Sequence, residues 1–243
     1  MKNIMLIAGC SHASGSEIDG SGDSQYNRSN SFGNLLANRL GYKPINISIS
    51  GSTNQGIARS VLDWITSNYN PKKHNLFVLI AWSESSRMEV PSPRVHHYDT
   101  ANQYTEYFND ENKKFLRVNF GYAGGDRWEQ DQSKYYQEFM AKNSEYLEIL
   151  SANLVLQLQY FLKLNRVQYL MCNTMNMFTD NTYVKTYIDK IDQAHYFNML
   201  DTSQSFWYKY KNLGFTNPKA KYWHHGEEPH KQFSEELYQF IRS

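Results

Sequence analysis

Ser11 stands at the end of the first apolar run of the chain, in "IMLIAGCSHASGSE", residues 4–17. The small residues after it predict a turn from a buried strand into a helix, at the sheet edge where open parallel sheets bind ligands. A helix N-terminus supplies N–H groups and positive potential that can hold a developing oxyanion or a phosphate. The alternative is a serine that only caps the helix.

A second strand-to-helix turn occurs in "INISISGSTNQGIARSVLD", residues 45–63. It passes through Gly51, which lacks a Cβ and therefore lets its N–H approach a substrate closely. Asn54 follows three residues later and could cap the helix or donate its side-chain amide. Two turns of this kind favour a binding or catalytic site over a single capped helix.

The elements that must position these residues are short buried strands alternating with helices. Apolar runs predict strands at 3–8, 45–50, 76–82 and 167–172, and spacing of three to four predicts helices at 31–42, 54–69 and 133–165 and a last helix near the C-terminus. This order predicts an α/β fold whose mostly parallel sheet is covered on both faces. We expect one domain over 1–243, with an irregular insertion at about 85–132.

Composition excludes several classes of partner. Lys plus Arg number 25 against 24 Asp plus Glu, so no strong field recruits nucleic acid or anionic lipid. No stretch reaches the roughly 20 apolar residues of a membrane span. The run before Cys10 is shorter than the roughly 7–15 apolar residues of an export signal, so the "IAGC" of a lipoprotein is not indicated.

Cysteine content points to a reducing compartment, because Cys10 and Cys172 are too few for a disulfide framework. Both follow apolar runs and are expected to be buried thiols at strand ends. We therefore expect a cytoplasmic protein. Aromatic residues make up 15% of the chain, which fits core edges or, as the alternative, a surface that stacks on sugars.

The stretches "GCSHASG" and "NISISGSTNQGIAR" resemble the SGNH (GDSL-like) hydrolase superfamily of esterases, thioesterases and carbohydrate deacetylases. The chain is also similar to SGNH-like proteins of tailed phages, especially cyanophages, which implies the cytoplasm of an infected host cell. The resemblance implies a three-layer α/β/α flavodoxin-like sandwich and a covalent acyl-enzyme on Ser11. It makes the N–H groups of Ser11 and Gly51 oxyanion donors.

Two motifs depart from that family. Ser83, in "AWSE", stands where the family has an asparagine, so its hydroxyl or the amide of Asn54 would have to serve as the further oxyanion donor. In "KYWHHGEEPHKQFSEEL", one register makes His224 the catalytic base, with Lys221 in place of the expected aspartate. The rival register pairs Glu227 with His230.

These observations support three hypotheses. The first is an SGNH-type serine hydrolase that cleaves an acyl ester of a small molecule or a glycan without a cofactor. The second is a catalytically degenerate binding or virion-associated module, because the aspartate and asparagine are absent. The third is a nucleotide- or phosphate-binding domain, which lacks a glycine fingerprint and an acidic ribose partner. Oligomeric state is left open.

Other motifs carry weaker signals. Arg87 could meet an anionic substrate group or could be a surface arginine. The adjacent His96 and His97 lack partners at metal-ligand spacing, so we predict no metal. "GYAGGD" at 121–126 is interpreted as a turn, and the literal "GDS" at 22–24 as a polar loop rather than the catalytic motif.

Overall fold

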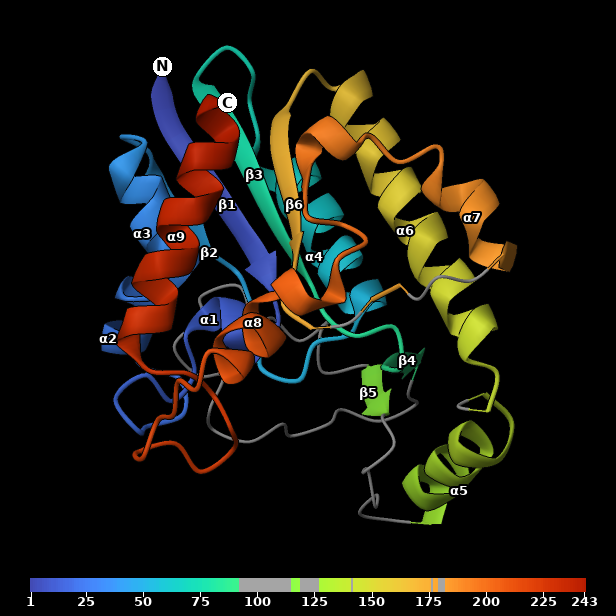
Figure 1. Cartoon of the computed structure of the whole chain (residues 1–243). Coiled ribbons are helices and arrows are strands. Elements are labelled where there is room, and N and C mark those ends of the chain that lie inside the picture. The colour runs from blue at the N-terminus through green and yellow to red at the C-terminus, as the bar shows by residue number, and fades with distance from the viewer. Residues whose placement is uncertain (92–114, 119–126, 141, 176, 179–181) are drawn as a thin grey trace.

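The computed structural model describes residues 1–91, 115–118, 127–140, 142–175, 177–178 and 182–243 (Figure 1). Its centre is a five-stranded sheet in the order β2-β1-β3-β6-β7. Every neighbouring pair in this sheet is parallel. The strands are β1 (Lys2–Gly9), β2 (Lys43–Asn46), β3 (His74–Trp82), β6 (Gln168–Asn173) and β7 (Tyr196–Phe197).

Helices cover both faces of this sheet, as Figure 1 shows. One face packs on α4 (Asn54–Asn68), α6 (Ser144–Leu164) and α7 (Thr182–Ile188), and the other on α3 (Phe32–Arg39), α8 (Phe206–Asn212) and α9 (Glu227–Arg242). Strands covered on both faces have no polar side, which is why their sequences are continuous apolar runs. The predicted α/β sandwich with a mostly parallel sheet is confirmed.

Shorter elements lie at the ends of these layers. Two short helices, α1 (Ser11–Ser14) and α2 (Gln25–Ser29), follow β1, and two 3₁₀ turns, η4 (Gln193–His195) and η5 (Thr202–Gln204), flank β7. Between β3 and α6, β4 (Met88–Pro91) pairs antiparallel with β5 (Phe115–Val118). This pair and the start of α5 (Arg127–Tyr135) occupy the described part of the segment that we expected to be irregular.

The helix predicted over 133–165 is wrong in its first third. The chain there forms the end of α5, a π-helical turn η3 (Tyr136–Met140), and only then α6. The side chain of Asn143 accepts the N–H of Tyr146 at 3.0 Å and so caps α6 at its N-terminus. The leucines of α6 nevertheless belong to the hydrophobic core, since Leu147, Leu158 and Leu162 are all buried.

The strand predicted at 45–50 is regular only to Asn46. Its continuation still runs beside β1, because Ile47 and Ile49 donate N–H bonds of 2.8 and 3.1 Å to Ile7 and Gly9. This extension carries the chain to the same sheet edge as Ser11. Both cysteines are fully buried free thiols at strand ends, as expected.

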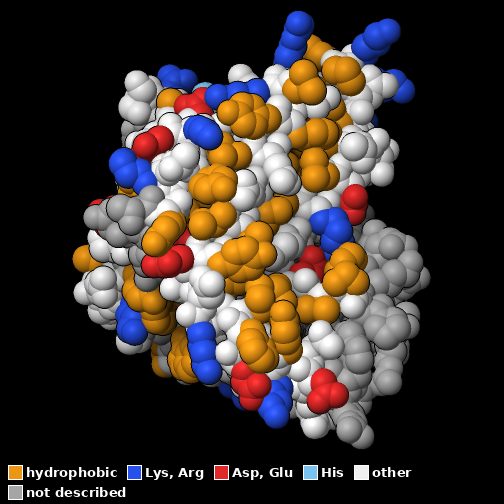
Figure 2. Space-filling view, turned by 90° about the vertical axis from the view of Figure 1, so that its right-hand side faces the viewer, with side chains coloured by type: hydrophobic (Ala, Val, Ile, Leu, Met, Phe, Trp, Pro, Cys, Tyr) orange, Lys and Arg blue, Asp and Glu red, His pale blue; other side chains and the backbone are white. Residues whose placement is uncertain are grey.

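The side of the molecule that carries α6 and α7 is rich in exposed apolar side chains. Figure 2 shows them as a band interrupted by charged groups. Tyr160 and Leu164 on α6 and Tyr183 on α7 are more than half exposed. Among the residues described, no helix combines the length and apolar character that a membrane crossing requires.

Candidate active site

Ser11 lies where β1 ends, as the first residue of α1. The N-cap residue of that helix is Cys10, so Ser11 is not the cap that the alternative interpretation required. A Cβ on Gly9 would lie 2.5 Å from the Cβ of Ala13 and 2.8 Å from the carbonyl oxygen of Ala81, so only glycine allows α1 to turn this tightly against the sheet. Ser11 is 8% exposed, which leaves it in a recess that is not sealed.

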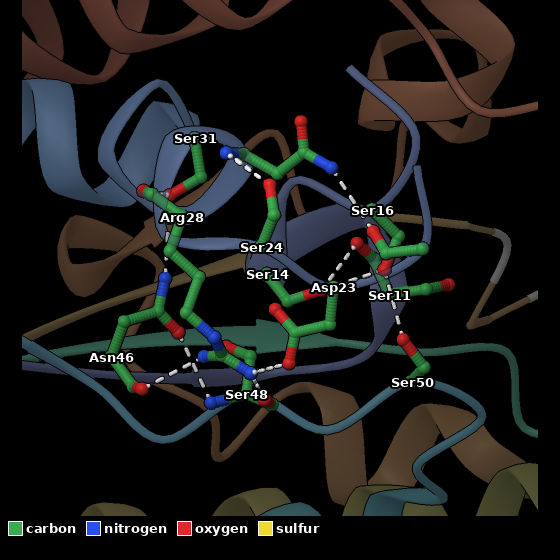
Figure 3. Close-up of polar contacts among 12 residues, drawn as sticks. Ser11, Ser14, Ser16, Asp23, Ser24, Arg28, Ser31, Asn46, Ser48 and Ser50 are labelled. Atoms are coloured by element: carbon green, nitrogen blue, oxygen red, sulfur yellow. Dashed lines mark hydrogen bonds and ion pairs between the residues drawn. The ribbon is translucent and has the colours of Figure 1, made fainter. Parts of the chain in front are cut away.

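A chain of serine hydroxyls fixes the turn that follows Ser11. The Oγ of Ser14 donates to the carbonyl of Ser11 at 2.9 Å and lies 2.9 Å from the Oγ of Ser16, which lies 2.9 Å from the Oγ of Ser50 (Figure 3). These contacts connect the turn after β1 to the turn that contains Gly51. The two predicted motifs therefore meet at one edge of the sheet.

Behind these serines lies a buried ion pair. The guanidinium of Arg28 lies 2.6 Å from the carboxylate of Asp23 and donates to the carbonyls of Asn46 and Ser48 at 2.9 and 3.0 Å (Figure 3). Burial raises the pKa of Asp23 although Arg28 opposes that shift. Ser24 caps α2 by accepting the N–H of Asn27. The literal "GDS" at 22–24 is thus part of a loop with a structural role, in agreement with its interpretation as a polar loop.

Gly51 has φ +72°, a left-handed conformation that favours glycine. Arg117 of β5 donates to the carbonyl of Ser50, and a Cβ at position 51 would lie 3.6 Å from its Nη1. Among the described residues, the N–H groups of Ser11 and Gly51 have no hydrogen-bond partner. Both can therefore donate to a bound oxyanion.

Asn54 and Ser83 bind each other instead of facing a ligand. The Oδ1 of Asn54 accepts the N–H of Ser83 at 2.9 Å, and its Nδ2 donates to the Ser83 carbonyl at 3.3 Å and to the Oγ of Ser151 at 3.2 Å. Thr53, not Asn54, caps α4. The Oγ of Ser83 is buried without a partner among the described residues. Asn54 thus joins α4 to the end of β3 through the Ser83 backbone, and its amide is not free to reach an oxyanion without rearrangement.

His224 has a carboxylate partner that the sequence interpretation did not foresee. Its Nδ1 lies 2.6 Å from Oε2 of Glu17, a residue six positions after Ser11. The same carboxylate accepts the backbone N–H groups of Lys221 and Tyr222, each at 2.9 Å. Lys221 stands where the family resemblance placed an aspartate, and here its backbone N–H binds the Glu17 carboxylate.

The ring of His12 links this pair to the nucleophile. Its centroid lies 4.9 Å from that of His224, and His12 directly follows Ser11 in α1. His12 is buried, and its Nδ1 has no hydrogen-bond partner among the described residues. His224 therefore lies beside the turn that carries Ser11.

The electrostatics keep both imidazoles neutral near pH 7. Burial lowers the pKa of His224, and the positive charge of Arg87 lowers it further, while the Glu17 carboxylate raises it. Burial also places the pKa of His12 well below its usual value, with smaller contributions from His224 and Arg87. A neutral His224 whose Nδ1–H points at a carboxylate leaves Nε2 unprotonated, which is the state a general base needs.

Arg87 acts on these rings from the end of the β3–β4 connection, directly before β4. Its Nε lies 2.8 Å from the Glu84 carboxylate, and its Nη2 lies 3.8 Å from the sulfur of Met175. Its side chain is only 15% exposed. The predicted role as a contact for an anionic substrate group remains a prediction; what the structure adds is its influence on both histidines.

The rival pair of Glu227 and His230 has other partners. The Nδ1 of His230 accepts the N–H of Phe32 at 3.2 Å, and burial lowers the pKa of this histidine to about 3. Glu227 accepts from the hydroxyl of Tyr26 and lies 3.1 Å from the ammonium of Lys231. His230 thus serves the packing of α9 on α3, and the geometry favours the register of His224.

Metal ligands and the remaining motifs add little. Within the described ranges, no group of three or more His, Cys, Asp or Glu side chains is arranged to hold a metal ion. His96, His97 and the "GYAGGD" stretch lie outside the described residues.

Glu17 and His12 are the residues that sequence reasoning missed. One signal was available for Glu17, because it is the first acidic residue after Ser11.

Comparison with known families decides the family of the chain. Residues 15–242 match the family described as "Family of unknown function (DUF6071)". The chain belongs to this family. No curated protein matches it in sequence. The comparisons do not show the similarity to phage proteins that the sequence suggested.

Comparison with solved structures shows which known proteins have a similar fold. The chain is similar to a carbohydrate esterase family 2 enzyme plus carbohydrate binding domain from Corynascus thermopiles (Myceliophthora fergusii), with 14% identity and a TM-score of 0.50 over 99% of this chain and 66% of that one. A psychrotrophic esterase from Pseudoalteromonas sp. matches at 15% identity and a TM-score of 0.46, over 99% and 97% of the two chains. At such identities the likeness to the first of these structures shows the fold alone.

Proposed function

We propose that the chain is a serine esterase of the SGNH type, in which Ser11, His224 and Glu17 form the catalytic triad. The observation that carries the proposal is the 2.6 Å contact between the Nδ1 of His224 and the Glu17 carboxylate. A carboxylate in this place holds the tautomer of the imidazole and stabilises the imidazolium that forms during the reaction. The substrate is an acyl ester of a small molecule or a glycan.

The reaction proceeds in two halves. The Oγ of Ser11 attacks the acyl carbon while the Nε2 of His224 takes the hydroxyl proton, and the N–H groups of Ser11 and Gly51 bind the oxyanion. His224 then gives its proton to the departing alcohol oxygen, which leaves an ester of the acyl group with Ser11. Water attacks this acyl-enzyme with His224 again as base, and the carboxylic acid leaves. No cofactor takes part.

The oxyanion site has two donors in place of three. Loss of one good donor lowers kcat by roughly 10²–10³-fold, and the Ser83 hydroxyl, which is buried without a partner among the described residues, has a shorter reach than an asparagine amide. We therefore expect a slow esterase. This same feature favours the second candidate function, a binding module of the SGNH fold that has lost catalysis.

Labelling with a fluorophosphonate tests the proposal. The folded protein should react at Ser11, as located by mass analysis of peptides. The Ser11→Ala variant should lose the label and at least roughly 10³-fold of its ester hydrolysis. The exposed Ser67 on α4 provides a matched control, and Ser67→Ala should keep both. A folded protein that leaves Ser11 unlabelled and hydrolyses ethyl acetate no faster than Ser11→Ala would favour the binding module.

A further inference from the structure

A cavity of about 500 Å³ opens beside His224 on the side of α8. Its aromatic lining consists of Trp207, Phe215 and Trp223, and its polar lining includes Lys211, Thr216 and His224 itself. We call it the tryptophan pocket. Because the proposed base forms part of its wall, a molecule seated in this pocket lies against the catalytic centre.

Trp223 is the most unusual residue of the pocket. Its side chain is 82% exposed, although burial of a tryptophan would be favourable. Its backbone has φ +66°, a strained conformation for a bulky residue. Strain of this kind persists where the surroundings enforce it, and it concentrates at ligand sites.

Other contacts of the pocket hold Trp223 in that position. The indole Nε1 of Trp207 donates to the carbonyl of Trp223 at 3.1 Å, and the ammonium of Lys211 lies 4.4 Å from the ring centre of Trp207. On the opposite wall, the amide of Asn217 donates to the Glu17 carbonyl at 2.8 Å. The pocket is therefore tied to both the acid and the base of the triad.

The chemistry of this lining fits a sugar ring. A pyranose has faces of C–H groups that pack on aromatic rings and hydroxyls around its edge that need polar partners. The indoles supply the aromatic faces. Lys211, which has no carboxylate partner among the described residues, and Thr216 supply polar groups at the rim. A plain alkyl chain would leave this ammonium and this hydroxyl unused.

We propose that the tryptophan pocket binds the sugar residue whose ester is cleaved, so that the alcohol half of the substrate is a glycan. This assignment rests on the proposed esterase function, since it places the sugar oxygen next to His224, which must protonate it. The acyl group then extends toward Ser11 and Gly51. Trp223 acts as a stacking platform and takes no part in the chemistry.

Binding is measured first, without catalysis. The Ser11→Ala variant is titrated with unesterified xylotetraose, cellotetraose, mannotetraose and chitotetraose by calorimetry. At least one should bind, and adding Trp223→Gly should weaken that binding about tenfold or more. Glycine accepts φ +66° without strain, so this change removes the ring and keeps the loop conformation. Tyr160→Ala, an exposed aromatic on α6, is the control and should bind as before.

Hydrolysis is measured next with two esters of the same acyl group. Trp223→Gly should lower kcat/KM about tenfold on the acetylated form of the bound oligosaccharide. The loss of kcat/KM on ethyl acetate should be at least threefold smaller, because ethanol is too small to fill the pocket. Trp223→Tyr should recover part of the loss on the sugar ester. An equal loss on both esters would show a structural role and overturn the assignment.

The outcomes separate the two proposals. Absence of binding by all four oligosaccharides, with Ser11-dependent hydrolysis of ethyl acetate intact, would overturn the sugar assignment and leave the esterase standing. Binding that depends on Trp223, without any hydrolysis that depends on Ser11, would overturn the esterase and support a sugar-binding module.

Discussion

The two loops that bring the triad together are built in opposite ways. The loop from Ser11 to Ser31 is held by buried polar contacts, including the Ser14–Ser16–Ser50 hydroxyls and the Asp23–Arg28 ion pair. In the loop before α9, Tyr222 and Trp223 are 60% and 82% exposed, while the side chains of His224 and His225 are largely buried. In the proposed enzyme, the first loop fixes the nucleophile and the second offers a surface for the substrate.

Glu17 is what makes these unlike loops act together. It belongs to the first loop, and its carboxylate binds two backbone N–H groups and the imidazole of the second. The first loop thereby positions the second through this carboxylate, and the amide of Asn217 adds a contact with the Glu17 carbonyl. Its own φ of +64° shows that the backbone is strained to present the carboxylate this way.

The largest effect is expected when this connection is broken. Glu17→Gln removes the charge and turns an NH₂ group toward partners that must donate, so His224 loses its preferred tautomer. We expect kcat for ethyl acetate to fall by roughly 10²–10⁴-fold, measured by pH-stat titration. Glu145→Gln on the surface of α6 is the control. A fall of less than about threefold would mean that Glu17 does not orient the base.

Breaking the rigid loop should affect stability instead. Asp23→Ala leaves the guanidinium of Arg28 buried without its carboxylate and should reduce the free energy of unfolding by about 3–5 kcal/mol. Urea denaturation measures the change. The double variant Asp23→Ala/Arg28→Met should regain part of it, because the uncompensated charge is gone. A loss below about 1 kcal/mol would show that the ion pair does not hold this loop.

The smallest effect concerns Arg87, which acts on the histidines of both loops. Its charge lowers the pKa of His224, so Arg87→Met should raise that pKa. The base must be neutral, and activity is therefore lost as pH falls through this pKa. The acidic limb of the kcat/KM profile should move to higher pH, with little change above it. A limb that stays in place would show that another group controls it.

The sequence predicts those features of the structure that depend on residues close together in the chain. The strands were found because burial on both faces leaves a continuous apolar pattern, and Ser11 and Gly51 because each sits in a strand-to-helix turn. The 133–165 helix was overextended because the cap at Asn143 interrupts a pattern that apolar spacing alone continues. Such a cap is a single side-chain hydrogen bond, and the spacing of apolar residues gives no sign of it.

The rest of the site could not be found in this way. Glu17 and His224 are 207 positions apart, and their pairing follows from where two irregular loops meet in space. Asn54 is an attractive amide donor in the sequence, but its bonds to Ser83 and Ser151 appear only in the folded chain. Trp207 and Trp223 likewise become neighbours only through the turn after α8.

Because the Glu17 carboxylate comes from the loop after Ser11 and not from the segment before His224, it changes the sequence pattern by which related chains can be found. Since position 221 donates its backbone N–H to the acid, any residue except proline can make that bond. A search pattern that demands an acid three residues before the histidine will pass over chains of this design. A pattern that couples the serine to an acid six residues later, and requires a histidine near the last helix, would retrieve them.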